Sequence, residues 1–292
     1  MIFLIKAIID TDIGDDIDDA LALALALRSP ELKVLAVTTI YGRVRLRARL
    51  AAKILKAFGE AETPVAMGAP KPLINPEPTH VPNQAPALDP GDVFSNITKK
   101  HAADLIVEVL KEEKDVTLIT LGPLTNIAIA LLKDRDAFKE ARLVVMGGCI
   151  GRPVLEHNIK ADPEAAHVVF TSQLPITLVS LDVTSKCIMP HTALQALKKS
   201  NRPPLKVLRR YLDLWTNATK GRPVMHDPLT VAVSFNQELV KKELMHVVVE
   251  LKGEYTRGLT MRIKGRSPNT EACTDVNVEE FMRLYEDRVL SE

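Results

Sequence analysis

The fold is decided by the stretch Ile8–Leu27, which is IIDTDIGDDIDDALALALAL. Its aspartates follow an apolar run over residues 2–9, interrupted only by Lys6, and precede an Ala/Leu run over residues 20–27. This order predicts a strand, an acidic loop and a buried helix. Because the first run shows no polar alternation, the strand suits the centre of a parallel sheet, where both faces are covered. Gly14 allows the chain to turn between the two elements.

Six aspartates lie within the ten residues 10–19: Asp10, Asp12, Asp15, Asp16, Asp18 and Asp19. Capping explains some of them, and we expect the helix to begin near Asp15 or Asp16. The other carboxylates would repel one another unless a cation neutralised them. Oxygen ligands favour a hard ion, Ca²⁺ or Mg²⁺, over zinc. The alternative is a solvated acidic helix start that binds nothing. An EF-hand is disfavoured because a strand precedes the loop and Gly14 occupies a ligand position.

Composition excludes several classes of function. The chain has 292 residues, a hydrophobic fraction of 46% and a net charge of +1, so neither a nucleic acid nor a membrane is expected as a partner. Its longest apolar stretch, residues 20–27, is too short to span a bilayer. The N-terminus lacks the pattern of a signal peptide. Three widely spaced cysteines indicate free thiols and a reducing compartment, so we expect a cytoplasmic protein. They are Cys149, Cys187 and Cys273.

Apolar runs and helical patterns alternate along the whole chain. Strands are expected at 33–39, 63–66, 115–121, 142–146, 175–180, 244–251 and 258–263, and helices at 44–58, 101–113, 124–132, 162–170, 191–220, from 226, and at 278–290. This alternation predicts an α/β fold, a single domain over residues 1–292 with a doubly wound, mainly parallel sheet. Ligands of such sheets bind at the carboxyl ends of the strands. The acidic loop, Leu121-Gly122, Gly147-Gly148 and Asp182 all fall at predicted strand ends and should therefore share one crevice.

The segment 69–92 contains seven prolines, which favours a long, stiffened loop over regular structure. A loop of this kind suits a lid or a subunit contact, and a surface insertion is equally compatible with it.

Five further motifs accompany the acidic stretch: LGPLTN at 121–126, MGG at 146–148, EHN at 156–158, DPEAA at 162–166 and HD at 226–227. In order and spacing the set resembles the nucleoside hydrolase family across nearly the whole chain. The resemblance implies a single α/β domain that hydrolyses the N-glycosidic bond of nucleosides and binds one Ca²⁺. It also implies a homo-oligomer, a dimer or tetramer, with a small nucleoside as its partner and a role in nucleotide salvage.

The resemblance also implies a set of site residues. Asp12, Asp19 and Asp227 correspond to carboxylate ligands of the metal, and Leu121 to a residue whose backbone carbonyl binds it. Asp18 corresponds to the base that takes a proton from the bound water. The usual opening of the family, D-x-D-x-G-x-D-D, is two residues shorter than the present one. Asp15 and Asp16 therefore have no counterpart, and we interpret them as a cap or outer shell. We expect Asp10 to hold the loop by hydrogen bonds.

Cleavage of a ribosyl C–N bond requires further groups. Glu156 and Asn158 are suited to bind ribose hydroxyls, and Glu156 also to stabilise a cationic sugar ring. His226 is suited to protonate the departing base. The alternatives are an ordinary polar loop at Glu156 and Asn158 and a capping or core histidine at 226. Asp162 is explained by capping of the helix that follows it.

Several positions depart from the family pattern. Arg43 follows Ile40-Tyr41-Gly42 where Asn or Asp is usual, residues 149–155 contain no Asn, and His80-Val81-Pro82-Asn83-Gln84 replaces His-Gly-x-x-Gly. Arg43 either begins a solvated run with the arginines at 45, 47 and 49 or enters the pocket and favours a phosphorylated ribosyl substrate. The missing Asn residues leave a non-catalytic or altered ribosyl-binding paralogue as a second alternative. A third is a phosphatase of the haloacid dehalogenase type, with Asp10 as nucleophile.

Overall fold

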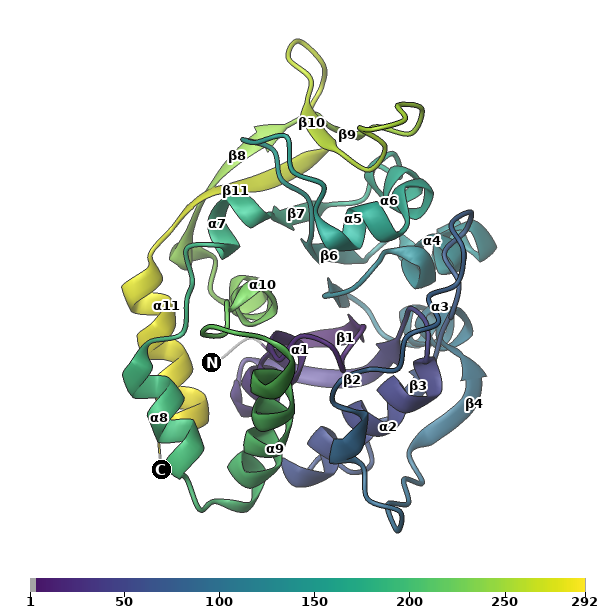
Figure 1. Cartoon of the computed structure of the whole chain (residues 1–292). Helices are drawn as coiled ribbons and strands as arrows, with labels where there is room; N and C mark the ends of the chain where they lie inside the picture. The colour runs from purple at the N-terminus through teal and green to yellow at the C-terminus, as the bar shows by residue number, and fades with distance from the viewer. Residues whose placement is uncertain (1–3, 292) are drawn as a thin grey trace.

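The computed structural model describes residues 4–291 and is built around one large sheet (Figure 1). Its nine strands follow the spatial order β4-β3-β2-β1-β5-β6-β7-β11-β8. They are β1 (Ile5–Thr11), β2 (Leu32–Thr39), β3 (Val65–Met67), β4 (Ile97–His101), β5 (Thr117–Thr120), β6 (Arg142–Met146), β7 (Ile176–Val179), β8 (Val240–Met245) and β11 (Thr270–Val276). Every neighbouring pair is parallel except β8 with β11. The α/β fold class with a mainly parallel sheet is confirmed.

Helices cover both faces of this sheet and enclose a separate hydrophobic core on each face. The first core contains side chains of α1 (Asp18–Arg28), α2 (Val44–Ala57), α8 (His191–Lys199), α9 (Pro203–Ala218), α10 (His226–Phe235) and α11 (Val278–Tyr285). The second contains side chains of α3 (Ala102–Glu112), α4 (Thr125–Lys133), α5 (His157–Ala161) and α6 (Pro163–Phe170). The short helix α7 (Leu181–Thr184) follows β7. Among residues 4–291, no helix combines the length and apolar character needed to cross a membrane.

The apolar run before the acidic loop forms β1 because each of its faces meets a different core. Ala7 and Ile9 belong to the first core, and Ile8 between them belongs to the second. Successive residues of a strand point to opposite sides, so a strand buried on both faces needs apolar residues at every position. The strand pairs with β2 on one side and β5 on the other, which makes it central.

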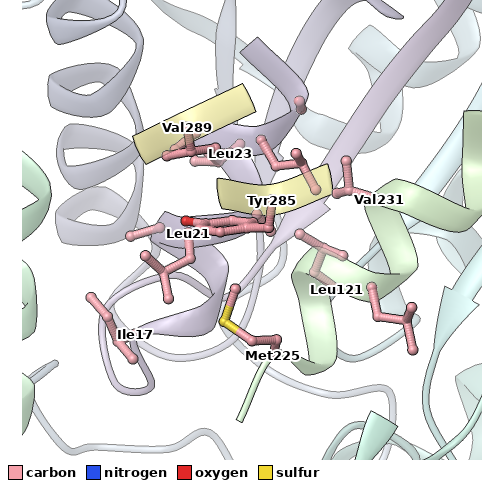
Figure 2. Close-up of a cluster of buried hydrophobic side chains, with 14 of the residues drawn as sticks. Ile17, Leu21, Leu23, Leu121, Met225, Val231, Tyr285 and Val289 are labelled. Carbon is pink, nitrogen blue, oxygen red and sulfur yellow. The ribbon is translucent and has the colours of Figure 1, made fainter. Parts of the chain in front are cut away.

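The Ala/Leu run forms α1, whose residues 18–26 are all buried. The helix packs against α10 and against the π-helical segment Glu286–Leu290 that follows α11, and Figure 2 shows Leu21 and Leu23 beside Tyr285 and Val289. Alanines let neighbouring helices approach closely, and the leucines between them fill the remaining space. This packing fixes the start of α1 relative to the start of α10.

Four details of the predicted elements are wrong. α1 begins at Asp18 with Ile17 as its N-cap residue, so neither Asp15 nor Asp16 caps it. Strands β4 and β11 were not predicted, because only one of the five residues of ITKKH and three of the seven residues of TEACTDV are hydrophobic. The expected strand 244–251 is divided between β8 and β9 (Val247–Val249), and β9 pairs with β10 (Thr260–Arg262) in a separate small sheet. The expected helix 191–220 is two helices, α8 and α9.

The order of the strands locates the functional end of the sheet. From β1 the chain proceeds outward through β2, β3 and β4, and it then returns to place β5 on the other side of β1. The connections after β1 and β5 therefore diverge and leave a crevice outside the carboxyl ends of these two strands, where α/β proteins bind ligands. Asp12 follows β1, and Leu121 follows β5.

Replacement of Leu23 by Ala is expected to lower the free energy of unfolding by about 3 kcal/mol, because it leaves a cavity beneath a fully buried helix. Leu132→Ala is the matched control: this side chain is 69% exposed, and its loss should change stability by less than about 0.5 kcal/mol. Urea denaturation of both variants measures the difference. Equal effects would contradict the packing described for α1.

Candidate active site

A pocket of about 520 Å³ opens at the carboxyl end of the sheet. Residues from the acidic loop, the ends of β5 and β6, α5 and the start of α10 line it, together with His80, Trp215 and Thr219. The residues predicted to bind metal, act in catalysis or bind ribose all line it: Asp12, Asp18, Asp19, Leu121, Glu156, Asn158, His226 and Asp227. The expectation that Asp182 shares the crevice is wrong: it does not line the pocket, and its carboxylate accepts from the N–H groups of Ile150 and Gly151. Residues more than 200 positions apart therefore face one cavity, which makes it the candidate active site.

Three of its carboxylates form a group that can hold a metal ion. One ligand oxygen each of Asp18, Asp19 and Asp227 lies within 4.8 Å of the other two, and the three residues are buried. The contact between α1 and α10 brings them together, and the backbone N–H of Asp227 donates to Asp18 Oδ2 at 3.3 Å. Thr11 Oγ1 donates to Asp19 Oδ1 at 2.5 Å.

These carboxylates are electrostatically costly. Burial first, and then repulsion from neighbouring aspartates, raises the pKa of Asp18, Asp19 and Asp227 well above its ordinary value. A divalent cation would remove this penalty, and a set of only oxygen ligands is the chemistry that a hard cation prefers. The residues present therefore fit a metal ion of this class.

Asp12 and Leu121 lie side by side at the ends of β1 and β5. Gly122 permits this approach, because a Cβ atom at that position would lie 2.9 Å from Asp12 Oδ1. The carbonyl of Leu121 accepts a hydrogen bond from Asn158 Nδ2 at 2.7 Å and keeps a second lone pair. Asp12 and the Leu121 carbonyl thus border the same pocket as the Asp18–Asp19–Asp227 group.

Asp10 lies behind the site and does not line the pocket. Its Oδ1 accepts hydrogen bonds from Thr38 Oγ1 at 2.5 Å and from Asn126 Nδ2 at 2.8 Å. Burial raises the pKa of Asp10 to about 7. These contacts tie β1 to β2 and α4, and they give Asp10 no access to a substrate. The position argues against a phosphatase in which Asp10 is the nucleophile.

Glu156 and Asn158 are held by the backbone around them. Glu156 caps α5: its Oε1 accepts from the N–H of Asn158 at 2.8 Å, and its Oε2 accepts from the N–H groups of Gly148 and Ile159 at 2.9 and 3.0 Å. Burial is the main cause that raises the pKa of Glu156. Asn158 bridges to the Leu121 carbonyl. Both side chains are therefore fixed in orientation before any ligand arrives.

His226 is the first residue of α10, and its Nδ1 lies 2.7 Å from Thr184 Oγ1. Burial lowers the pKa of His226 to about 4, so the ring is neutral near pH 7. A neutral imidazole oriented through Nδ1 can still act as a hydrogen-bond donor or acceptor through Nε2.

The sequence interpretation missed Arg47, which was assigned to a solvated arginine run. Arg47 is fully buried, and its guanidinium donates to the carbonyls of Asp12, Ile13 and Tyr41 and to Asp15 Oδ2. A signal was present, because Arg47 shares a helix face with Leu50, Ala51 and Ile54 at spacings of three, four and seven residues. Such a position on an amphipathic helix is buried.

Arg43, by contrast, is exposed and does not line the pocket. Among the described residues, no lysine or arginine lines the cavity, whose charged side chains are aspartates and Glu156. The charge of the pocket therefore gives no support to the hypothesis of an anionic, phosphorylated substrate.

Comparisons with known proteins agree with this arrangement. Residues 7–283 match the family model "Inosine-uridine preferring nucleoside hydrolase". The pyrimidine-specific ribonucleoside hydrolase RihA of Escherichia coli O127:H6 (strain E2348/69 / EPEC) is 34% identical over 97% of both chains. A plant nucleoside hydrolase, PpNRh1, superposes with a TM-score of 0.87 at 27% identity over 98% of this chain and 99% of its own. A purine-preferring ribonucleoside hydrolase from Gardnerella vaginalis gives 0.87 at 28% identity over 97% and 98%.

The chain belongs to the nucleoside hydrolase family. Within that family it is an N-ribohydrolase, an enzyme that hydrolyses the N-glycosidic bond of ribonucleosides.

Replacement of Arg47 by Leu is expected to lower the free energy of unfolding by about 3 kcal/mol, because the loop carbonyls and Asp15 lose a buried charged partner. Arg45→Leu, two residues away on the exposed side of α2, is the control and should change stability by less than about 0.5 kcal/mol. Denaturant titration measures both variants. A neutral effect of Arg47→Leu would refute its role as the internal support of the acidic loop.

Proposed function

We propose that this enzyme cleaves ribonucleosides into base and ribose with a Ca²⁺ ion held at the acidic end of the pocket. The observation that carries this proposal is the convergence of Asp18, Asp19 and Asp227 within 4.8 Å of one another. When bound, the cation lowers the pKa of a water molecule and clamps the sugar diol. Ca²⁺ suits the site better than Mg²⁺ because it accepts many carboxylate and carbonyl oxygens in an irregular arrangement.

The ligands that we propose are Asp12, Asp19, Asp227 and the carbonyl of Leu121, with Asp18 as the base that takes a proton from the attacking water. The position of Asp18 in the pocket lining, beside Asp19 and Asp227, supports a proton-accepting role. The same geometry supports an exchanged assignment, in which Asp18 is a ligand and Asp12 the base, because Asp18 belongs to the close triad. Separate variants of the two aspartates distinguish these assignments.

The remaining side chains act on the sugar and the base. We propose that Asn158 and Glu156 bind ribose hydroxyls and that Glu156 stabilises positive charge on the ring, as their fixed orientation at the pocket wall supports. His226 is proposed to donate to the departing base. Because its ring is neutral, it would donate the Nε2 proton as negative charge develops on the base nitrogen.

Neither the fold nor the carboxylate group Asp18–Asp19–Asp227 determines which base is preferred. Relatives of similar likeness are named pyrimidine-specific in one case and purine-preferring in another. We propose that the part of the pocket wall formed by His80, Trp215 and Thr219 contributes to this choice. We also propose a cytoplasmic homo-oligomer with a role in nucleotide salvage; the three buried free cysteines support a reducing compartment.

Release of base from a panel of purine and pyrimidine nucleosides tests the proposal. A chelator is expected to abolish turnover and added Ca²⁺ to restore it. Asp18→Ala is expected to lower kcat by at least about a hundredfold while Ca²⁺ still binds, since general base catalysis contributes about 10²–10⁴-fold. Calorimetric Ca²⁺ titration and circular dichroism accompany the kinetics.

Asp136→Ala is the control, because this aspartate is 81% exposed and does not line the pocket. Loss of Ca²⁺ binding in Asp18→Ala, with retained binding and lost turnover in Asp12→Ala, would establish the exchanged assignment. Turnover that resists chelation would refute the metal mechanism.

The charge of the pocket also predicts a substrate preference. A nucleoside 5′-monophosphate is expected to be cleaved at least about tenfold less efficiently than its nucleoside, because its phosphate enters a cavity lined by carboxylates without a lysine or arginine among the described residues. The ratio of kcat/KM for the two compounds measures this preference. If the monophosphate were cleaved as efficiently as the nucleoside, or more efficiently, the hypothesis that Arg43 favours a phosphorylated substrate would be supported instead.

A further inference from the structure

The segment 80–84 of the proline-rich loop is fastened directly to the acidic loop. Gln84 binds through its backbone N–H to the Gly14 carbonyl at 2.9 Å and through Nε2 to the Asp16 carbonyl at 2.7 Å. Asn83 Nδ2 donates to the Asp15 carbonyl at 3.2 Å. A long loop that would otherwise be free to move thus follows the backbone that carries the metal group.

Asp15 is the centre of this attachment. Its Oδ1 accepts from the N–H of Asn83 at 3.3 Å, and its Oδ2 lies 2.8 Å from both Arg47 Nη2 and His80 Nε2. Arg47 cannot follow a moving loop, because the same guanidinium is held by the carbonyls of Ile13 and Tyr41. One carboxylate therefore connects a fixed internal cation to two residues of the outer segment.

The packing of Pro82 on Gly14 adds a steric element. Gly14 has a φ of +133°, and a Cβ atom there would lie 2.8 Å from Pro82 Cβ. The two segments therefore touch through backbone and ring, with no room for a side chain between them. The contact brings His80 to the pocket, which it lines together with Asp15 and Asp16.

We propose that Asp15, held by Arg47, is a positioning residue that fixes the segment His80–Gln84 as a preformed wall of the nucleoside pocket. This inference rests on the proposed function for its ligand, a nucleoside, and goes beyond it in assigning a role to the acidic loop outside the metal group. A wall that is ordered in advance saves the entropy of ordering it when substrate binds, and the saving is expressed as a lower KM.

The rest of the proline-rich loop supplies an internal comparison. Residues 89–92 are anchored independently, since Lys53 Nζ lies 2.6 Å from Asp89 Oδ2 and 2.8 Å from Asp92 Oδ2. Neither aspartate lines the pocket. Lys53→Met should therefore loosen residues 89–92 and leave KM unchanged, while Asp15→Ala should loosen residues 80–84 and leave residues 89–92 protected.

Hydrogen–deuterium exchange and steady-state kinetics on the full chain test the proposal. In Asp15→Ala we expect the amides of Asn83 and Gln84 to exchange at least about tenfold faster, KM to rise about tenfold, and kcat and Ca²⁺ affinity to stay within about twofold. Asp15→Asn keeps an acceptor for the Asn83 amide. Its exchange rates and its KM should therefore lie between those of the wild-type protein and those of Asp15→Ala. It also serves as the second variant if Asp15→Ala does not fold.

A double-mutant cycle with His80 shows whether the effect is transmitted through the segment. If it is, KM of Asp15→Ala/His80→Ala should exceed that of the more affected single variant by no more than about twofold. Additive increases, or unchanged exchange in Asp15→Ala, would overturn the proposal. A fall in kcat together with Ca²⁺ affinity would assign Asp15 to the metal instead. Exchange needs no turnover, so failure of the proposed activity would be recognised separately.

Discussion

The structure depends on the burial of several carboxylates where β1 ends. Asp18, Asp19 and Asp227 are each 4% exposed, and burial and mutual repulsion oppose their ionisation. A fold can maintain such a group only if the surrounding elements are too well packed to separate. The fully buried α1, the central β1 and the contact between α1 and α10 provide this rigidity. The repulsion among these carboxylates is the physical reason for our proposal that they hold a cation.

A buried arginine, Arg47, partly offsets the repulsion among the aspartates of the acidic loop. Arg47 provides a positive charge beneath the acidic loop. Its guanidinium donates hydrogen bonds to backbone carbonyls and to Asp15, and not to the Asp18–Asp19–Asp227 group. The internal cation therefore shapes the loop without occupying the position of the metal ion. A lysine would not serve equally well, because its single ammonium cannot reach acceptors spread along two segments.

Elements with a regular pattern of apolar residues could be predicted from the sequence. The apolar run of β1, the Ala/Leu run of α1 and the carboxyl-end position of Asp12 and Leu121 could all be predicted from pattern and from parallel-sheet geometry. β4 and β11 could not, because edge and late strands of mixed polarity derive their stability from pairing partners distant in the chain. The start of α1 was misplaced because Asp15 is engaged by Arg47 and His80, contacts that no local rule contains. The family motifs located residues that line the pocket; they carried no information about Arg47 or about the segment 80–84.

Some residues of the pocket lie on packed elements and others lie on loops. This arrangement is compatible with different base preferences within one family. The Asp18–Asp19–Asp227 group lies at the starts of α1 and α10, Asp12 and Leu121 follow β1 and β5, and Glu156 and Asn158 lie at the start of α5, all elements fixed by the two cores. Part of the remaining wall comes from the proline-rich loop, through His80, and from the end of α9, through Trp215 and the following Thr219. Loops tolerate substitution far better than packed strands, since a changed loop alters few buried contacts. Substitutions at His80, Trp215 and Thr219, which we propose contribute to base preference, would therefore leave the packed elements of the site unchanged. The fastening of residues 80–84 to the acidic loop is the point where these two parts of the molecule are mechanically coupled.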